Sequence, residues 1–176
     1  MFAGDLTMGG SFKELEEEVK WLQSLPYRLK VFVPGNHDIA IETLMNKGLE
    51  RRMRELLFKD VHYLRDSGVV LDGVRFWGTP FIPESRVGSG AFIADENVLA
   101  QHFAKIPLDI DVLVTHTPPA RILDDGVGST ELAAAVQRVS PKLNVFGHVH
   151  DCGGKQCVIG RTLYVNAAKH PLVCSL

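Results

Sequence analysis

The sequence predicts an α/β fold in which two mixed β-sheets pack face to face, with helices flanking the sheets. Helical patterns alternate with apolar, strand-like runs as far as residue 58, and hairpins follow in the middle and at the end of the chain. Such a succession is typical of sheets layered with helices. The 176 residues, 45% of them hydrophobic, are enough for one domain with a core and few for two.

The N-terminal third of the chain alternates strands and helices. Residues 1–5 end a strand and enter a turn. The capping box at residues 11–14 begins a helix with one apolar side, which Leu25-Pro26 ends. A strand is predicted over residues 29–33, and a second amphipathic helix over residues 39–58.

From residue 68 the hydrophobic period changes to that of strands. Residues 68–77 are predicted to form a hairpin about Asp72-Gly73, because Asp-Gly favours a two-residue turn. Residues 79–94 are rich in glycine, proline and serine and are predicted to be a surface loop that can border a site. The remaining predicted elements are a helix capped by Asp95 as far as residue 104, a strand at 111–114, a helix at 129–139, a strand at 143–146, a hairpin at 157–165 and an edge strand at 172–176.

Charge and hydropathy exclude several classes of protein. A formal net charge of −2 gives no reason to expect general binding to nucleic acid or to anionic membranes. No apolar run is long enough to cross a bilayer, and the N-terminus lacks the basic and apolar regions of a signal peptide. The three cysteines are odd in number and clustered late, which argues against a disulfide framework and favours a cytoplasmic location.

The prediction of function centres on Gly35-Asn36-His37-Asp38, which ends an apolar strand. Asn36 offers a neutral oxygen to a cation, and His37 can transfer a proton near neutral pH. Asp38 can hold the imidazole of His37 in one orientation. Other metal-competent side chains also follow apolar strands: Asp5, His116, His148 and His150.

These side chains are predicted to converge on a metal site, because open α/β sheets place their sites at the carboxyl ends of strands. His148 and His150 are two residues apart, so a turn, for which Gly147 is suited, must aim both inward. Aspartate, asparagine and histidine ligands without cysteine suit an open catalytic site for Mn, Fe or Zn better than a calcium or structural zinc site. A shared carboxylate can hold two cations about 4 Å apart to activate water for attack on phosphorus.

Four motifs follow one another over nearly the whole chain: Gly4-Asp5, Gly35-Asn36-His37-Asp38, Thr115-His116 and Gly147-His148-Val149-His150. In this order they resemble the motifs of the calcineurin-like metallophosphoesterases. Finer features resemble the small metallophosphoesterase-domain-containing subgroup, in which cyclic-nucleotide-type phosphodiesterase activity is known. These features are Thr115-His116-Thr117-Pro118-Pro119, the stretch 141–148 and Tyr164-Val165-Asn166-Ala167.

The resemblance implies a role for each site residue. Asp5 would bridge two metal ions, and His150 would serve the first. The second metal would be completed by Asn36, His116 and His148. His37, paired with Asp38, would bind the phosphate with Asn36 and protonate the leaving oxygen, while a metal-bridging hydroxide attacks. Mn is the expected metal, with Fe, Zn or Mg as alternatives, and the expected substrate is a small phosphorylated molecule such as a cyclic nucleotide.

One motif of the family has no counterpart here. The family's Asp-x-His, which supplies two ligands of the first metal, does not occur before Gly4-Asp5. We therefore expect a single, N-terminally truncated calcineurin-like phosphoesterase domain over residues 1–176, with the first strand of the fold missing. One metal would bind well, the other site would be incomplete, and activity would be weak or absent. The sheet edge exposed in this way would favour self-association.

Three functions remain open. The leading one is hydrolysis of a phosphodiester or phosphomonoester. The first alternative is a catalytically inactive metal-binding or interaction protein of the same fold, against which the His37-Asp38 pair argues, because a pure scaffold would not need it. The second is a nuclease-type phosphoesterase, which the absence of a basic run disfavours. His62, His102 and His170 are expected to be surface or structural residues, and the acidic run at 14–18 a solvated helix face.

Overall fold

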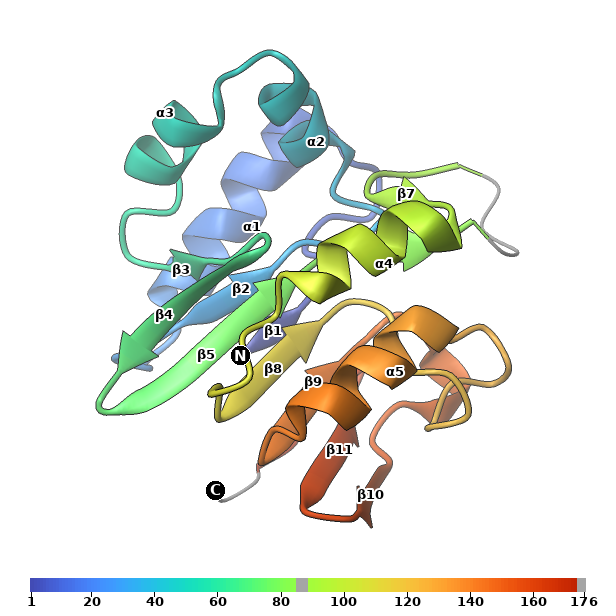
Figure 1. Cartoon of the computed structure of the whole chain (residues 1–176). Helices are drawn as coiled ribbons and strands as arrows, with labels where there is room; N and C mark the ends of the chain where they lie inside the picture. Colours follow the sequence, from blue (N-terminus) through green and yellow to red (C-terminus); the bar gives the residue numbers. More distant parts are fainter. Residues whose placement is uncertain (85–88, 174–176) are drawn as a thin grey trace.

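Two β-sheets pack face to face, and helices cover the outer side of each (Figure 1). The computed structural model describes residues 1–84 and 89–173. The strands are β1 (Phe2–Ala3), β2 (Val31–Val33), β3 (His62–Tyr63), β4 (Ser67–Leu71), β5 (Val74–Thr79), β6 (Ile82–Pro83), β7 (Ile93–Ala94), β8 (Val112–Thr115), β9 (Leu143–Phe146), β10 (Gln156–Ile159) and β11 (Thr162–Asn166). The helices are α1 (Phe12–Ser24), α2 (Ile39–Asn46), α3 (Glu50–Leu56), α4 (Glu96–Ala104) and α5 (Thr130–Val139), with a 3-10 turn, η1, at His150–Cys152.

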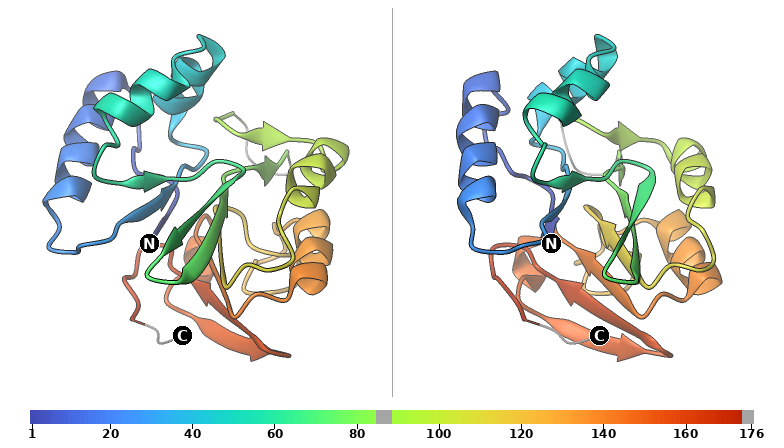
Figure 2. Two further views of the ribbon diagram at one scale, coloured as in Figure 1. Left: turned by 60° about the vertical axis from the view of Figure 1, so that its left-hand side comes forward. Right: turned by 90° about the vertical axis from the view of Figure 1, so that its left-hand side faces the viewer.

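The larger sheet has the strand order β10-β11-β9-β8-β5-β4, and the smaller sheet has the order β1-β2-β3. The four inner strands of the larger sheet are parallel, while β4 and β10 pair antiparallel at its edges. Figure 2 shows α1 on one side of the stacked sheets, with α4 and α5 on the other. The predicted fold class is confirmed, as are both predicted hairpins; Asp72 and Gly73 turn the first with φ of 49° and 80°.

Three apolar layers hold these elements together. Val33 of the smaller sheet and Val114 of the larger sheet lie in the layer between the sheets. Their neighbours face the other way: Phe32 packs beneath α1, α2 and α3, and Leu113 packs beneath α4 and α5. All four side chains are fully buried. Strands buried on both faces explain the continuous apolar runs that predicted them.

The predicted helix at 12–24 is confirmed, but the single helix predicted over residues 39–58 is wrong. Ser11 accepts a hydrogen bond from the Glu14 N–H and begins α1. The second pattern is divided into α2 and α3. Gly48, with φ of 70°, donates to the Met45 carbonyl at 2.8 Å and ends α2 in a left-handed turn. A glycine in this conformation ends a helix even where the apolar pattern continues beyond it.

The surface loop predicted over residues 79–94 is wrong in the part that the structure describes. Within it, β6 and β7 pair in parallel, and Ile82 and Phe92 are buried. The segment does border the strand ends, since the Ala91 N–H donates to the Asn36 carbonyl at 2.9 Å. Residues 85–88 lie outside the described residues, as do residues 174–176 of the predicted C-terminal strand, while residues 172 and 173 form no strand.

Glu50 joins α3 to the segment between β3 and β4. Its carboxylate accepts hydrogen bonds from Arg54 of the same helix at 2.9 Å and from the Arg65 guanidinium at 2.7 and 3.1 Å. Burial alone would raise the pKa of Glu50, but the two guanidinium groups outweigh it and lower the pKa below its usual value. The ionised form therefore stabilises the fold.

We predict that Glu50→Gln lowers the free energy of unfolding at pH 7 by about 1 kcal/mol. Because the folded-state pKa is depressed, the contribution of Glu50 is complete above the ordinary glutamate pKa of about 4.3 and is lost as pH falls through the folded value. Urea unfolding of both chains between pH 7 and pH 3 measures the difference. Glu55→Gln, on an exposed ion pair of the same helix, is the control. A difference that stays constant with pH would contradict the prediction.

Candidate metal centre

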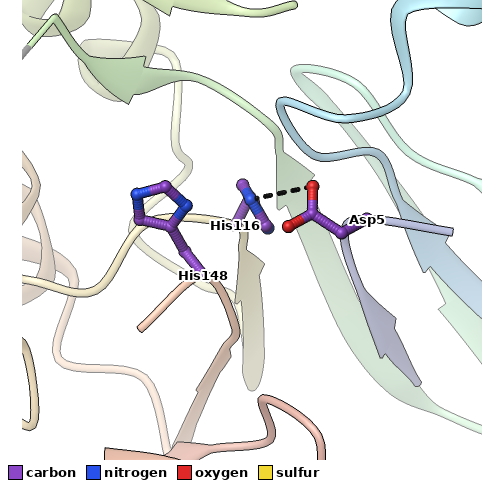
Figure 3. A group of neighbouring side chains, drawn as sticks. All are labelled: Asp5, His116 and His148. Carbon is purple, nitrogen blue, oxygen red and sulfur yellow. Dashed lines mark ion pairs between the residues drawn. The ribbon is translucent and has the colours of Figure 1, made fainter. Parts of the chain in front are cut away.

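Three side chains from different strand ends point toward one another: Asp5, His116 and His148 (Figure 3). Their ligand atoms all lie within 4.8 Å of one another. The Nε2 atom of His116 lies 3.3 Å from the Asp5 Oδ1 atom. Asn36 completes the group, with its Oδ1 atom 3.0 Å from His116 Nε2 and 3.1 Å from His148 Nδ1. The predicted convergence of these four side chains is present in the structure.

The turns that follow the strands allow this close approach. A Cβ atom at Gly4 would lie 2.0 Å from the His116 Nδ1 atom, and one at Gly35 would lie 2.4 Å from the Asp5 Oδ1 atom. Asp5 and His148 themselves have left-handed backbones, with φ of 57° and 64°. The turn that aims His148 inward is therefore made at His148, not at Gly147 as the sequence suggested.

The tautomer of His116 follows from its surroundings. Its Nδ1 atom lies 2.8 Å from the Ala3 carbonyl, which can only accept, so Nδ1 carries a proton. The other ring nitrogen, Nε2, then faces two further acceptor atoms, the Oδ1 atoms of Asp5 and Asn36. Three acceptor atoms that meet in a buried place need a positive charge between them, which either a proton on Nε2 or a bound cation can supply. These donors fit a divalent cation of the kind that takes mixed oxygen and imidazole ligands.

The pKa values of the group reflect how closely its charged side chains approach one another. Burial alone would raise the pKa of Asp5, but His116 beside it and the His37 N–H lower it to about 2. Burial alone would lower the pKa of His116, but the Asp5 carboxylate and the Ala3 carbonyl raise it. Burial and the neighbouring His116 lower the pKa of His148 to about 4, so its ring is neutral at pH 7. A neutral imidazole is the form that binds metals.

The expected pairing of His37 with Asp38 is wrong. The Asp38 carboxylate is fully buried and accepts hydrogen bonds from the backbone N–H groups of Gly35, Leu6 and Thr7 at 2.7, 3.3 and 2.8 Å. Burial raises its pKa, while these N–H groups favour the ionised form. Asp38 also makes no side-chain cap at the start of α2. Its carboxylate holds the β1 and β2 loops together because their N–H groups surround it.

His37 is oriented by a different group. Its Nδ1 atom lies 2.9 Å from the Met8 carbonyl, and its backbone N–H donates to Asp5 Oδ1 at 3.0 Å. Sequence reasoning missed Met8, and it also missed Glu14, whose carboxylate accepts hydrogen bonds from Met8 and Gly9 and is not merely solvated. The position of Glu14 in the capping box was the available signal.

His150 does not join the compact group. It is exposed on η1, and it is absent from the cluster of Asp5, His116 and His148. Its assignment to a first metal stays a prediction. Asn166 stabilises the turn that precedes His150, because its Nδ2 atom donates to the Val149 carbonyl at 2.9 Å. His102 is structural, with its Nδ1 atom 2.5 Å from the Asp66 carboxylate.

Comparison with known proteins decides the family. The sequence model of calcineurin-like phosphoesterases matches residues 1–152. The chain belongs to this family. It is 33% identical over 190 residues to human metallophosphoesterase domain-containing protein 1, covering 94% of this chain and 58% of that protein. It is also 33% identical over 179 residues to the UPF0046 protein K07C11.7 of Caenorhabditis elegans, covering 95% of this chain and 61% of the relative.

The chain thus spans about three fifths of the length of these relatives, which support the predicted subgroup of the family. The fold is similar to the crystal structure of TT1561 of Thermus thermophilus, with a TM-score of 0.69 at 16% sequence identity, over 94% of this chain and 74% of that one. Among the described residues, no helix has the length and apolar character needed to cross a membrane.

We predict that Gly35→Ala greatly reduces metal binding, because the added Cβ atom would occupy space held by the Asp5 carboxylate and the His116 ring. Metal content after incubation with Mn and gel filtration measures the effect. Gly126→Asn is the control, since Gly126 has a left-handed backbone that asparagine tolerates and nothing lies within 4 Å of its Cβ position. Equal metal content in both variants would show that the glycine is not required by the site.

Proposed function

We propose that the chain is a metal-dependent phosphoesterase that hydrolyses a small phosphodiester or phosphomonoester. The observation that carries this proposal is the meeting of Asp5, Asn36, His116 and His148 around one point, with His37 hydrogen-bonded to Asp5 beside it. Membership of the calcineurin-like phosphoesterase family supports it. A divalent cation at this point would activate water and offset the charge that develops on the phosphoryl oxygens.

Residues of the chain have separate roles in binding the cation, binding the phosphate and donating a proton. Asp5, Asn36, His116 and His148 would hold the cation. The Ala3 carbonyl fixes the His116 ring with Nε2 toward Asp5 and Asn36. His37 is half-buried at the border of the group. Its Nδ1–H donates to the Met8 carbonyl, so Nε2 is the nitrogen left for the phosphate. When the ring is doubly protonated, the Nε2–H would give its proton to the leaving oxygen and return the ring to the neutral Nδ1–H form.

We propose that one cation binds tightly per chain and that Mn is preferred. The four donors combine oxygen and imidazole without thiolate, which suits Mn better than softer metals. For a second cation, Asp5 would have only the exposed His150 as a further predicted ligand, so we propose that turnover by this chain is weak. We propose a cyclic nucleotide as the substrate, because the resemblance to the small metallophosphoesterase-domain-containing subgroup implies it.

We predict that the protein incubated with Mn retains about one metal per chain and hydrolyses bis(p-nitrophenyl) phosphate slowly. His116→Ala should lose the metal and the activity, because it removes the buried imidazole at the centre of the donor set. His170→Ala, at an exposed site, is the matched control. Two metals per chain with rapid turnover would contradict the single-site proposal.

Substrate competition separates the remaining functions. Inhibition of the hydrolysis by a cyclic nucleotide supports a small-molecule enzyme, and stronger inhibition by an oligonucleotide would favour a nuclease-type enzyme. One bound metal with no turnover would favour a metal-binding or interaction protein of the same fold.

We further propose a cytoplasmic location, supported by the free thiols of Cys152 and Cys157. We also propose self-association through β1, which is an edge strand of the smaller sheet. A monomer measured by light scattering at high protein concentration would contradict this proposal.

A further inference from the structure

The loop between β1 and α1 lies against the His37 turn and is held there by two carboxylates. Asp38 binds Thr7 through both its backbone N–H and its hydroxyl, at 2.8 and 3.0 Å. Glu14, in the first turn of α1, accepts from the Met8 N–H at 2.6 Å and from the Gly9 N–H at 3.0 Å. The backbone of the loop is therefore fixed on both sides of the Met8 carbonyl.

One peptide group connects Glu14 to His37. The Gly9 N–H and the Met8 C=O belong to the same planar peptide unit and point in opposite directions. When the Glu14 carboxylate binds the N–H side, the C=O side must point away from Glu14, and there it meets the His37 Nδ1 atom at 2.9 Å. A charge-assisted hydrogen bond at one end of such a chain also polarises the next bond.

This arrangement determines which nitrogen of His37 is available for chemistry. A carbonyl oxygen can only accept, so His37 Nδ1 carries a proton and Nε2 is left for the substrate. The loop is tied to the same residue a second time, because the Thr7 hydroxyl shares its one proton between the His37 carbonyl at 2.9 Å and the Asp38 carboxylate at 3.0 Å. Both the position and the tautomer of the imidazole thus depend on this loop.

We infer that Glu14 is a positioning residue that sets the orientation and tautomer of His37 through the Met8–Gly9 peptide. Its importance for turnover rests on the proposed function, in which His37 protonates the leaving group. The Glu14 carboxylate binds the Met8 and Gly9 backbone N–H groups, so it acts on His37 through the loop.

The tautomer can be measured without turnover. Long-range ¹H–¹⁵N spectra of the whole chain should show His37 protonated at Nδ1 in its neutral form. Glu14→Ala should remove this preference, and Glu14→Gln, which keeps an acceptor oxygen for the loop, should largely retain it. Glu16→Gln, an exposed glutamate of the same helix, is the matched control. An unchanged Nδ1–H signal in folded Glu14→Ala would overturn the inference.

A double-mutant cycle tests the catalytic consequence. Glu14→Ala should lower kcat for an ester with an alkyl leaving group about tenfold, which is less than the full contribution of a general acid. It should lower kcat much less for a p-nitrophenyl ester, whose leaving group needs no proton. In the His37→Ala variant, adding Glu14→Ala should not lower kcat further. The metal content should be the same in the wild type and in all three variants. Additive losses would overturn the inference.

The two proposals fail in different ways. A wild-type chain that binds metal but hydrolyses neither ester would refute the proposed function, while the imidazole spectra would still decide the role of Glu14. Spectra that show no effect of Glu14→Ala, with hydrolysis intact in the wild type, would refute only the positioning role.

Discussion

The site depends on how closely the two sheets approach at the ends of β1, β2, β8 and β9. His116 is fully buried there, with one ring nitrogen on the Ala3 carbonyl of the smaller sheet and the other toward Asp5 and Asn36. Any side chain at Gly4 or Gly35 would collide with this ring or with the Asp5 carboxylate. The absence of two Cβ atoms is what lets oxygen and nitrogen donors from both sheets share one small volume.

A second constraint is the buried carboxylate of Asp38. Three backbone N–H groups and one hydroxyl surround it, from the loops after β1 and β2. A buried anion satisfied in this way holds its donors in place, since the loss of one partner leaves a polar group unpaired in the interior. Asp38 therefore stabilises the two loops that carry Asp5 and His37. The ring is oriented from the other side, by Met8.

Much of this could be predicted from the sequence. The long strands and helices could be predicted because period and capping residues are local, as Ser11, Asp95 and Ser129 show by accepting from the N–H groups three residues on. The convergence of Asp5, Asn36, His116 and His148 could also be predicted, since they follow apolar strands that end at the same edge. The same reasoning included His150, which lies apart from this group.

What could not be predicted depends on distant contacts. The partners of Asp38 at Leu6 and Thr7 lie 32 and 31 residues away in sequence. The left-handed backbone of His148 is unfavourable for a residue with a side chain and persists only because the surrounding structure imposes it. The strands β3, β6 and β7 have two residues each, too few for a period. Gly48, by contrast, is a local signal for the end of a helix. The apolar pattern continues beyond this glycine and so predicts a single helix.

The hydrogen bond between Ala3 and His116 spans 113 residues, and the contact between Asn36 and His148 spans 112. Contacts so distant in sequence form only after the intervening chain has been made and ordered. During synthesis the donor set stays incomplete until residue 148 has left the ribosome and β9 has joined its sheet. This cluster is therefore one of the last parts of the fold to be completed, and a nascent chain that holds only the first three motifs lacks His148.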